Sequence, residues 1–149
     1  MRFDPQPGGC LCGAVRNRLN ADPVTLYACH CTDCQAGSGS AFALSLLIQE
    51  DSLAFTGANP VLAECGLGSG RRKRTFYCPE CHTEVCDQSS VAGIRNLRAG
   101  TLDDTSWLEP IGHIWTRSAQ RWVSMADGTL RYPGQPDDYL ELVRAWKSR

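Results

Sequence analysis

YACHCTDC, residues 27–34, places three cysteine thiols within six residues of each other. Packing alone does not readily explain such a Cys-X-Cys-X-X-Cys cluster. Residues two apart in a β-strand project to the same face, so Cys29 and Cys31 can converge on one ion while His30 points the other way. Cys34 needs only a turn to join them. Three thiolates resemble a zinc site whose fourth position is open to water or substrate.

The chain has 149 residues, which is close to the size of one domain and long enough to bury a core of its own. We expect a single domain over residues 1–149. A net charge of -1 gives no general electrostatic reason to bind nucleic acid or an anionic membrane. The first residues lack an apolar signal segment, and the longest apolar-rich run, Ala41 to Ile48, is too short to span a bilayer. We therefore expect a cytoplasmic protein.

The chain contains nine cysteines, a high and odd number. Without an export signal, such thiols are better explained as reduced metal ligands or catalytic groups than as disulfides. Cys65 and Cys86 lie outside any ligand pattern. The other seven fall into spacing motifs, which are Cys10 and Cys12, then Cys29, Cys31 and Cys34, then Cys78 and Cys81.

The pattern of apolar residues predicts a mainly β chain that ends in a short helix. Apolar and polar side chains alternate over residues 14–19, as in a half-buried strand, and residues 41–48 form a second predicted strand with Phe42, Leu44, Leu46 and Ile48 on one face. A hairpin is expected over residues 83–97, and the glycines between Ala63 and Gly70 indicate an exposed loop. The helix is predicted near the C-terminus, where a docked face would consist of Tyr139, Leu142, Val143 and Trp146.

Three further features have both a functional and a plainer interpretation. The segment Gln35–Ser40 could approach a ligand beside the metal, although taken alone it is more simply a connector. The basic run Arg71–Arg74 could hold a phosphate or carboxylates, but a solvated strand end is the simpler interpretation. His113 lies within an apolar segment, residues 110–115, and is more readily a packed or hydrogen-bonded histidine than a ligand.

Two metal sites account for the seven clustered cysteines better than one site does. Four thiolates complete a tetrahedral structural zinc site, and the remaining three leave one vertex open. The four-cysteine site would join the start of the chain to its middle and close a loop of roughly 70 residues. Alternatively, His82 or Cys86 supplies a fourth ligand to Cys29, Cys31 and Cys34, and the spacing does not decide this point. The four ligands of the structural site would be Cys10, Cys12, Cys78 and Cys81.

The charge of an open site indicates which chemistry it could perform. Three thiolates on one zinc ion sum to a charge of -1, which makes the ion a weak Lewis acid and ill suited to ionising water. A substrate thiol at the fourth vertex would be held as a thiolate at neutral pH and would remain nucleophilic. An open triple-cysteine site therefore favours thiol chemistry.

Six motifs together resemble those of a known family, and they are Gly9–Val15, Cys29–Cys34, Ser38–Phe42, Phe76–Cys81, Arg98–Asp103 and His113–Trp115. On these motifs the chain resembles the glutathione-dependent formaldehyde-activating enzymes, also called the centromere protein V type of domain. The resemblance implies a β-tent fold like that of a small group of zinc-binding chaperones, with structural zinc on the paired cysteines and catalytic zinc on the triple cluster. One departure is His82, where the family usually has glycine.

The implied reaction adds the thiol of glutathione to formaldehyde and gives S-hydroxymethylglutathione, which is classed as a carbon-sulfur lyase reaction in reverse. The resemblance implies two zinc ions per chain, a thiol and an aldehyde as partners, and substrate contacts at Ser38, Gly39 and Ser40. One rival function is a non-enzymatic zinc module that binds protein or nucleic acid, supported only by Arg71–Arg74. A redox store of zinc or thiols is a third possibility.

Overall fold

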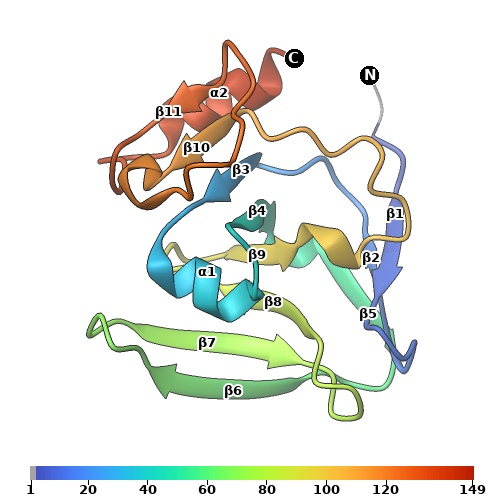
Figure 1. The fold of residues 1–149 in the computed structure, drawn as a ribbon. Helices are drawn as coiled ribbons and strands as arrows, with labels where there is room; N and C mark the ends of the chain where they lie inside the picture. Colours follow the sequence, from blue (N-terminus) through green and yellow to red (C-terminus); the bar gives the residue numbers. More distant parts are fainter. Residues whose placement is uncertain (1–2) are drawn as a thin grey trace. The chain divides into compact units, whose positions relative to one another are not determined.

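The computed structural model describes residues 3–149, and these residues divide into two compact units. Among the described residues, unit 1 consists of residues 3–23 and Leu46–Trp107, and unit 2 consists of Val24–Ser45 and Leu108–Arg149. Strands dominate both units, and a short helix ends the chain, which confirms the predicted mainly β fold (Figure 1). The expectation of a single domain stays a prediction. No helix within residues 3–149 is long and apolar enough to cross a membrane.

Unit 1 begins with a three-stranded antiparallel sheet in the order β1-β2-β5. Val15, Asn17 and Leu19 of β2 are buried and alternate with two more exposed arginines, as the sequence predicts. The bounds are β1 Gln6–Gly9, β2 Val15–Leu19 and β5 Leu53–Gly57, with a 3-10 helix, η1, at Glu50–Ser52 before β5.

The rest of unit 1 is an antiparallel arrangement in the order β9-β8-β7-β6 (Figure 1). The pairing of β7 with β8 shifts at Phe76 and Tyr77, which marks a bulge. The bounds are β6 Val61–Gly66, β7 Arg72–Tyr77, β8 Glu84–Gln88 and β9 Ile94–Arg98, followed by the 3-10 helix η2 at Ala99–Thr101.

Two local predictions in unit 1 are wrong. The expected loop over residues 63–70 is a strand as far as Gly66, because β6 pairs with β7 and Cys65 lies opposite Lys73. The second strand of the predicted hairpin begins at Ile94 rather than Val91, because Gly93 has φ +76° and belongs to the turn.

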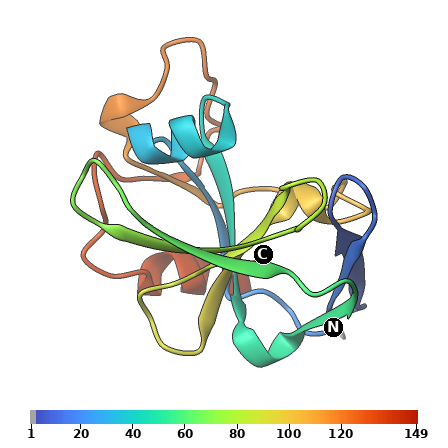
Figure 2. The same cartoon turned by 90° about the horizontal axis from the view of Figure 1, so that it is seen from below.

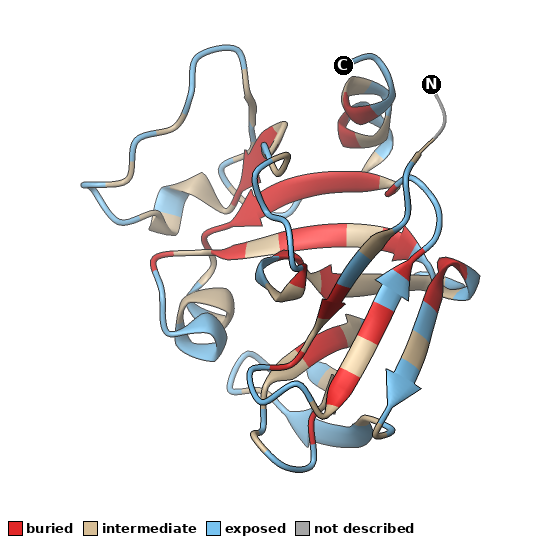
Figure 3. Ribbon diagram, turned by 90° about the vertical axis from the view of Figure 1, so that its right-hand side faces the viewer, coloured by how far each residue is buried: buried red, intermediate tan, exposed pale blue. Residues whose placement is uncertain are grey.

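Unit 2 is built on three parallel strands in the order β3-β10-β11. β3 is buried along its whole length (Figure 3), and the neighbouring β4 begins in unit 2 and ends in unit 1. The bounds are β3 Thr25–Cys29, α1 Thr32–Ser38, β4 Ala43–Gln49, β10 Gly112–Ile114, η3 Thr116–Ser118, β11 Leu130–Arg131 and α2 Leu140–Lys147.

The C-terminal helix α2 docks on unit 2 as predicted. Leu142 and Trp146 are 0% and 1% exposed and share one face of the helix. Thr25 of β3 donates a 3.1 Å hydrogen bond from its hydroxyl to the carbonyl of Leu142. The Asp138 carboxylate accepts a 2.8 Å hydrogen bond from the backbone N–H of Leu140, which satisfies one free donor at the start of the helix.

Candidate functional site

The four paired cysteines of unit 1 come together at one point. Their Sγ atoms all lie within 4.8 Å of one another, and the Sγ atom of Cys12 is 3.6 Å from that of Cys10 and 3.8 Å from that of Cys78. Gly13 has φ +79° and donates a hydrogen bond to the carbonyl of Cys10, so this tight turn requires a residue without Cβ. The fourth member of this four-cysteine cluster is Cys81.

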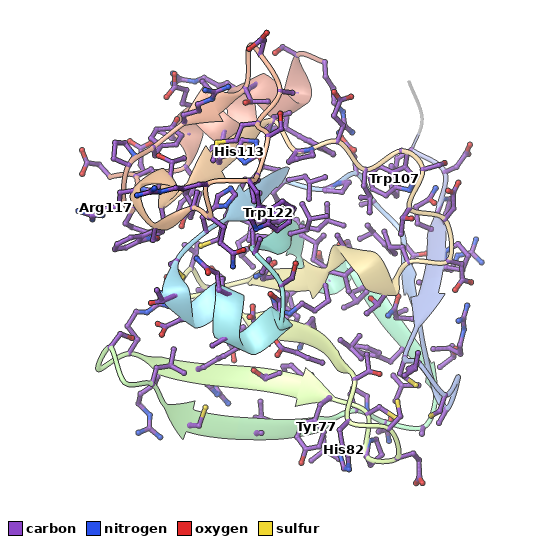
Figure 4. All side chains as sticks on the ribbon, in the orientation of Figure 1. Tyr77, His82, Trp107, His113, Arg117 and Trp122 are labelled. Atoms are coloured by element: carbon purple, nitrogen blue, oxygen red, sulfur yellow. The ribbon has the colours of Figure 1, made fainter. Side chains whose placement is uncertain are left out.

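His82 lies in the turn that follows Cys78 and adopts the left-handed backbone conformation that glycine favours. It has φ +60°, and its backbone N–H donates a 3.0 Å hydrogen bond to the carbonyl of Cys78. Its ring centroid lies 6.2 Å from that of Tyr77 (Figure 4). The departure from the family pattern therefore preserves the turn, at the cost of a side chain in the left-handed region.

The sulfurs of the four-cysteine cluster cannot all ionise on their own. The Thr83 hydroxyl lowers the pKa of Cys81 to about 5. The pKa of Cys12 is raised to about 12, because the favourable Ala14 N–H is outweighed by neighbouring thiols such as Cys81. A bound dication would remove this repulsion and allow four thiolates.

The triple-cysteine cluster, Cys29, Cys31 and Cys34, lies where β3 ends and α1 begins in unit 2. Its three Sγ atoms also lie within 4.8 Å of one another. Cys31 is the N-cap of α1, and its sulfur accepts a 3.3 Å hydrogen bond from the backbone N–H of Cys34. The three thiols therefore come together because Cys29 ends a strand, Cys31 caps the following helix and Cys34 lies in the first turn of that helix.

The triple-cysteine cluster is also poorly able to ionise without a cation. The pKa of Cys29 is raised first by its hydrogen bond with the Cys34 thiol and then by burial. Burial likewise raises the pKa of Cys31. Thiolate sulfur is a preferred ligand of zinc, and metal binding displaces thiol protons. Both clusters therefore have donor sets that could hold zinc.

His30 points away from the triple-cysteine cluster into a buried pair with His113. Its Nε2 atom lies 2.9 Å from Nδ1 of His113, and its ring centroid lies 5.3 Å from that of Phe42, with the two ring planes tilted by 53°. Burial lowers the pKa of both histidines. The Nδ1 atom of His30 is buried and has no hydrogen-bond partner among residues 3–149. His113 thus has the packed, hydrogen-bonded environment that its sequence context favours.

The segment after Cys34 is a helix rather than the predicted connector. α1 continues to Ser38, and Gly39 ends it with φ +64°. The Ser38 hydroxyl lies 2.7 Å from the Cys34 carbonyl and accepts a 3.2 Å hydrogen bond from the Ser40 N–H. This hydroxyl therefore serves the end of α1, and substrate contacts at residues 38–40 stay a prediction.

The two remaining cysteines and the basic run are accounted for within unit 1. Cys65 is exposed on β6, whereas Cys86 is buried in β8, where burial raises its pKa to about 11. Arg72 and Arg74 both pair with Glu64, and Lys73 pairs with Glu84. Three of the four cations of Arg71–Arg74 are thus ion-paired with glutamates of the same sheet.

Sequence reasoning missed the polar residues that fix the triple-cysteine cluster to the segment after β10. Figure 2 shows this segment beside α1. Gln35 donates hydrogen bonds to the carbonyls of His30 at 2.8 Å and Ser118 at 2.9 Å. Ser118 in turn donates a 2.9 Å hydrogen bond to the His30 carbonyl. Glutamine and serine 83 residues apart carry no local pattern that would have predicted this contact.

Comparison with known proteins gives one family. The family model described as "Glutathione-dependent formaldehyde-activating enzyme" matches residues 5–118. No curated protein matches the chain. A crystal structure of a Rhodobacter sphaeroides protein is similar at 17% sequence identity and a TM-score of 0.48, covering 85% of this chain and 98% of that one.

Proposed function

Because the chain belongs to the glutathione-dependent formaldehyde-activating enzyme family, we propose that it adds a thiol cosubstrate, glutathione or a related thiol, to a small aldehyde such as formaldehyde. The thiol sulfur forms a bond to the aldehyde carbon, and the thiol proton ends on the carbonyl oxygen. The product is a hemithioacetal, the S-hydroxymethyl derivative of the thiol when the aldehyde is formaldehyde, and no oxidant or reductant is needed. The reverse reaction is that of a carbon-sulfur lyase.

The observation that carries this proposal is the triple-cysteine cluster with its three sulfurs within 4.8 Å. A zinc ion held by Cys29, Cys31 and Cys34 would supply an open coordination position where a cosubstrate sulfur is stabilised as thiolate. The chain itself holds these ligands in place. The Cys34 N–H fixes the Cys31 sulfur, and burial of Cys29 limits the access of water to one side of the cluster.

The second zinc ion has a structural role in this proposal. Four thiolates saturate a tetrahedral ion and leave no position for substrate. The four-cysteine cluster joins Cys10 and Cys12 of the first turn to a turn that begins with Cys78. Closing a chain segment of roughly 70 residues restricts the unfolded chain and so stabilises unit 1.

Metal analysis and thiol titration together test the proposal. We expect two zinc ions per chain, binding of glutathione to the zinc-loaded protein, and formation of S-hydroxymethylglutathione when formaldehyde is added. Cys31→Ala should remove one zinc ion and abolish thiol binding. Cys65→Ala is the matched control, since this exposed thiol lies outside both clusters. Unchanged glutathione binding in Cys31→Ala would show that the thiol binds elsewhere.

The rival interpretation as a nucleic-acid or protein module has little support. Its one sequence argument was the basic run, and Arg72, Lys73 and Arg74 of this run are ion-paired with glutamates. Surface cations that are already paired contribute less to phosphate binding. The reducing environment of the cytoplasm, rich in glutathione, suits the proposed enzyme.

A further inference from the structure

A chain of side-chain hydrogen bonds runs outward from α1 to an exposed tryptophan. The Gln35 Oε1 atom accepts a 3.2 Å hydrogen bond from Nε2 of Gln120. The Oε1 atom of Gln120 accepts a 2.7 Å hydrogen bond from Nε1 of Trp122. Gln35 directly follows Cys34 in α1. Two glutamine amides therefore fix Trp122 relative to the helix that carries a candidate zinc ligand.

Trp122 differs from an ordinary surface residue because it is both exposed and oriented. It is 74% exposed, whereas Trp146 of the same unit is 1% exposed in the core. The polar N–H of its indole is already used by Gln120. What the side chain offers to a ligand is therefore the apolar face of its ring, held in a fixed direction.

The segment that presents Trp122 starts from a strained residue. Trp115 has φ +58°, a left-handed conformation that is unusual for a large side chain. The Trp115 N–H donates to the Gly134 carbonyl at 3.2 Å, and the Trp115 carbonyl accepts from the Ser118 N–H at 3.1 Å. Such strain persists only where the surroundings fix the backbone, and it is concentrated at functional sites.

We propose that Trp122 is a specificity-determining residue on which the body of a peptide-like thiol packs while its sulfur occupies the triple-cysteine site. Gln120 and Gln35 act as positioning residues. This inference rests on the proposed function. Planar amide groups of a peptide-like thiol can stack on an indole face, whereas a small thiol has nothing to place there. Arg121 is exposed and makes no ion pair within residues 3–149, so it is available for a carboxylate of the same ligand.

Calorimetric titration of the zinc-loaded protein with two thiols tests the inference. We expect Trp122→Ala to weaken glutathione binding by about three- to tenfold and to leave 2-mercaptoethanol binding unchanged. Leu140→Ala is the matched control, because this residue is also exposed and apolar but lies on α2. It should bind both thiols as the wild type does. Zinc content should be the same in all three proteins.

Tryptophan fluorescence gives a second readout that does not depend on activity. The change in emission on adding glutathione should disappear in Trp122→Phe and remain in Trp107→Phe.

Steady-state kinetics test the positioning role of Gln120. Gln120→Leu removes both hydrogen bonds of the Gln120 amide. This variant should raise the KM for glutathione while kcat at saturation stays the same, because the zinc ligands are untouched.

The outcomes separate this inference from the proposed function. Binding of both thiols to the wild type with no loss of glutathione affinity in Trp122→Ala would overturn the role of Trp122 alone. Equal weakening of both thiols in Trp122→Ala would also overturn it, since the residue would then act on the metal site rather than on the body of the thiol. Failure of the zinc-loaded wild type to bind either thiol would overturn both.

Discussion

Replacing His113 by leucine should destabilise the protein because it removes the hydrogen-bond partner of the buried His30 side chain. Of the two ring nitrogens of His30, Nε2 lies 2.9 Å from Nδ1 of His113, and Nδ1 has no hydrogen-bond partner among residues 3–149. His113→Leu therefore leaves a fully buried imidazole without a hydrogen bond. A stranded buried polar group costs about 1–3 kcal/mol, so we expect a loss of about 2 kcal/mol in the free energy of unfolding.

A double-mutant cycle separates this effect from a loss of packing. Leucine at both positions replaces two polar partners by apolar side chains, which can be nearly neutral. We expect the double variant of His30 and His113 to be less destabilised than the sum of the single variants by about 1–3 kcal/mol. Urea unfolding of the zinc-loaded proteins, followed by circular dichroism, measures each value. Strict additivity would refute the reasoning, because it would mean that the imidazoles do not depend on each other.

Three further predictions concern the cysteines and the strained turn. Burial raises the pKa of Cys86 to about 11 in the folded protein, so between about pH 9 and about pH 11 the thiol is protonated in the folded state but ionised in the unfolded chain. The free energy of unfolding should therefore fall as the pH rises through this range. The difference in the free energy of unfolding between the wild type and Cys86→Ala should accordingly shrink by about 1.4 kcal/mol between about pH 7.5 and about pH 10. If urea unfolding gave the same difference at both pH values, this prediction would be contradicted. His82→Val should be less stable than His82→Asn by about 1 kcal/mol in thermal unfolding, since a β-branched residue at φ +60° is strained, and equal stabilities would argue against that strain. Cys78→Ser should lower the zinc content from two ions to one and destabilise the protein more than Cys65→Ser, and an unchanged zinc content would contradict the four-cysteine site.

Strands in which buried and exposed side chains alternate could be predicted, because the two-residue period of a strand alone decides which side chains face the core. In β2 the burial of Val15 and Leu19 on one face follows from side-chain period alone. Two of the wrong predictions occurred where a non-local partner or a helix cap decides the structure. The strand pairing of Cys65 depends on Lys73 in β7, and α1 depends on a cysteine cap at Cys31 that the usual preferences for serine, threonine, asparagine and aspartate do not include.

The candidate site was predictable in its ligands but not in its surroundings. Cysteine spacing is local, so the convergence of Cys29, Cys31 and Cys34 could be derived from strand and turn geometry. The supporting contacts join residues that are far apart in the chain, as in the hydrogen bond from Gln35 to the Ser118 carbonyl. Such polar contacts have no sequence period, and only the folded arrangement reveals them.

The two clusters present the same ligand atom, and the different roles proposed for them follow from how each sulfur would be stabilised. With zinc in both clusters, as the proposed function requires, a thiolate added to the triple-cysteine cluster would give the ion four thiolates, the same number that the four-cysteine cluster would supply. In the four-cysteine cluster each sulfur has a hydrogen-bond donor that the chain places nearby, whereas an incoming thiol brings no such donor. The charge of an incoming thiolate would therefore be the least stabilised of the four, which would keep it nucleophilic. The donors of the four-cysteine cluster are the N–H of Val15 to Cys10, the N–H of Ala14 to Cys12, the N–H of Glu80 to Cys78 and the hydroxyl of Thr83 to Cys81.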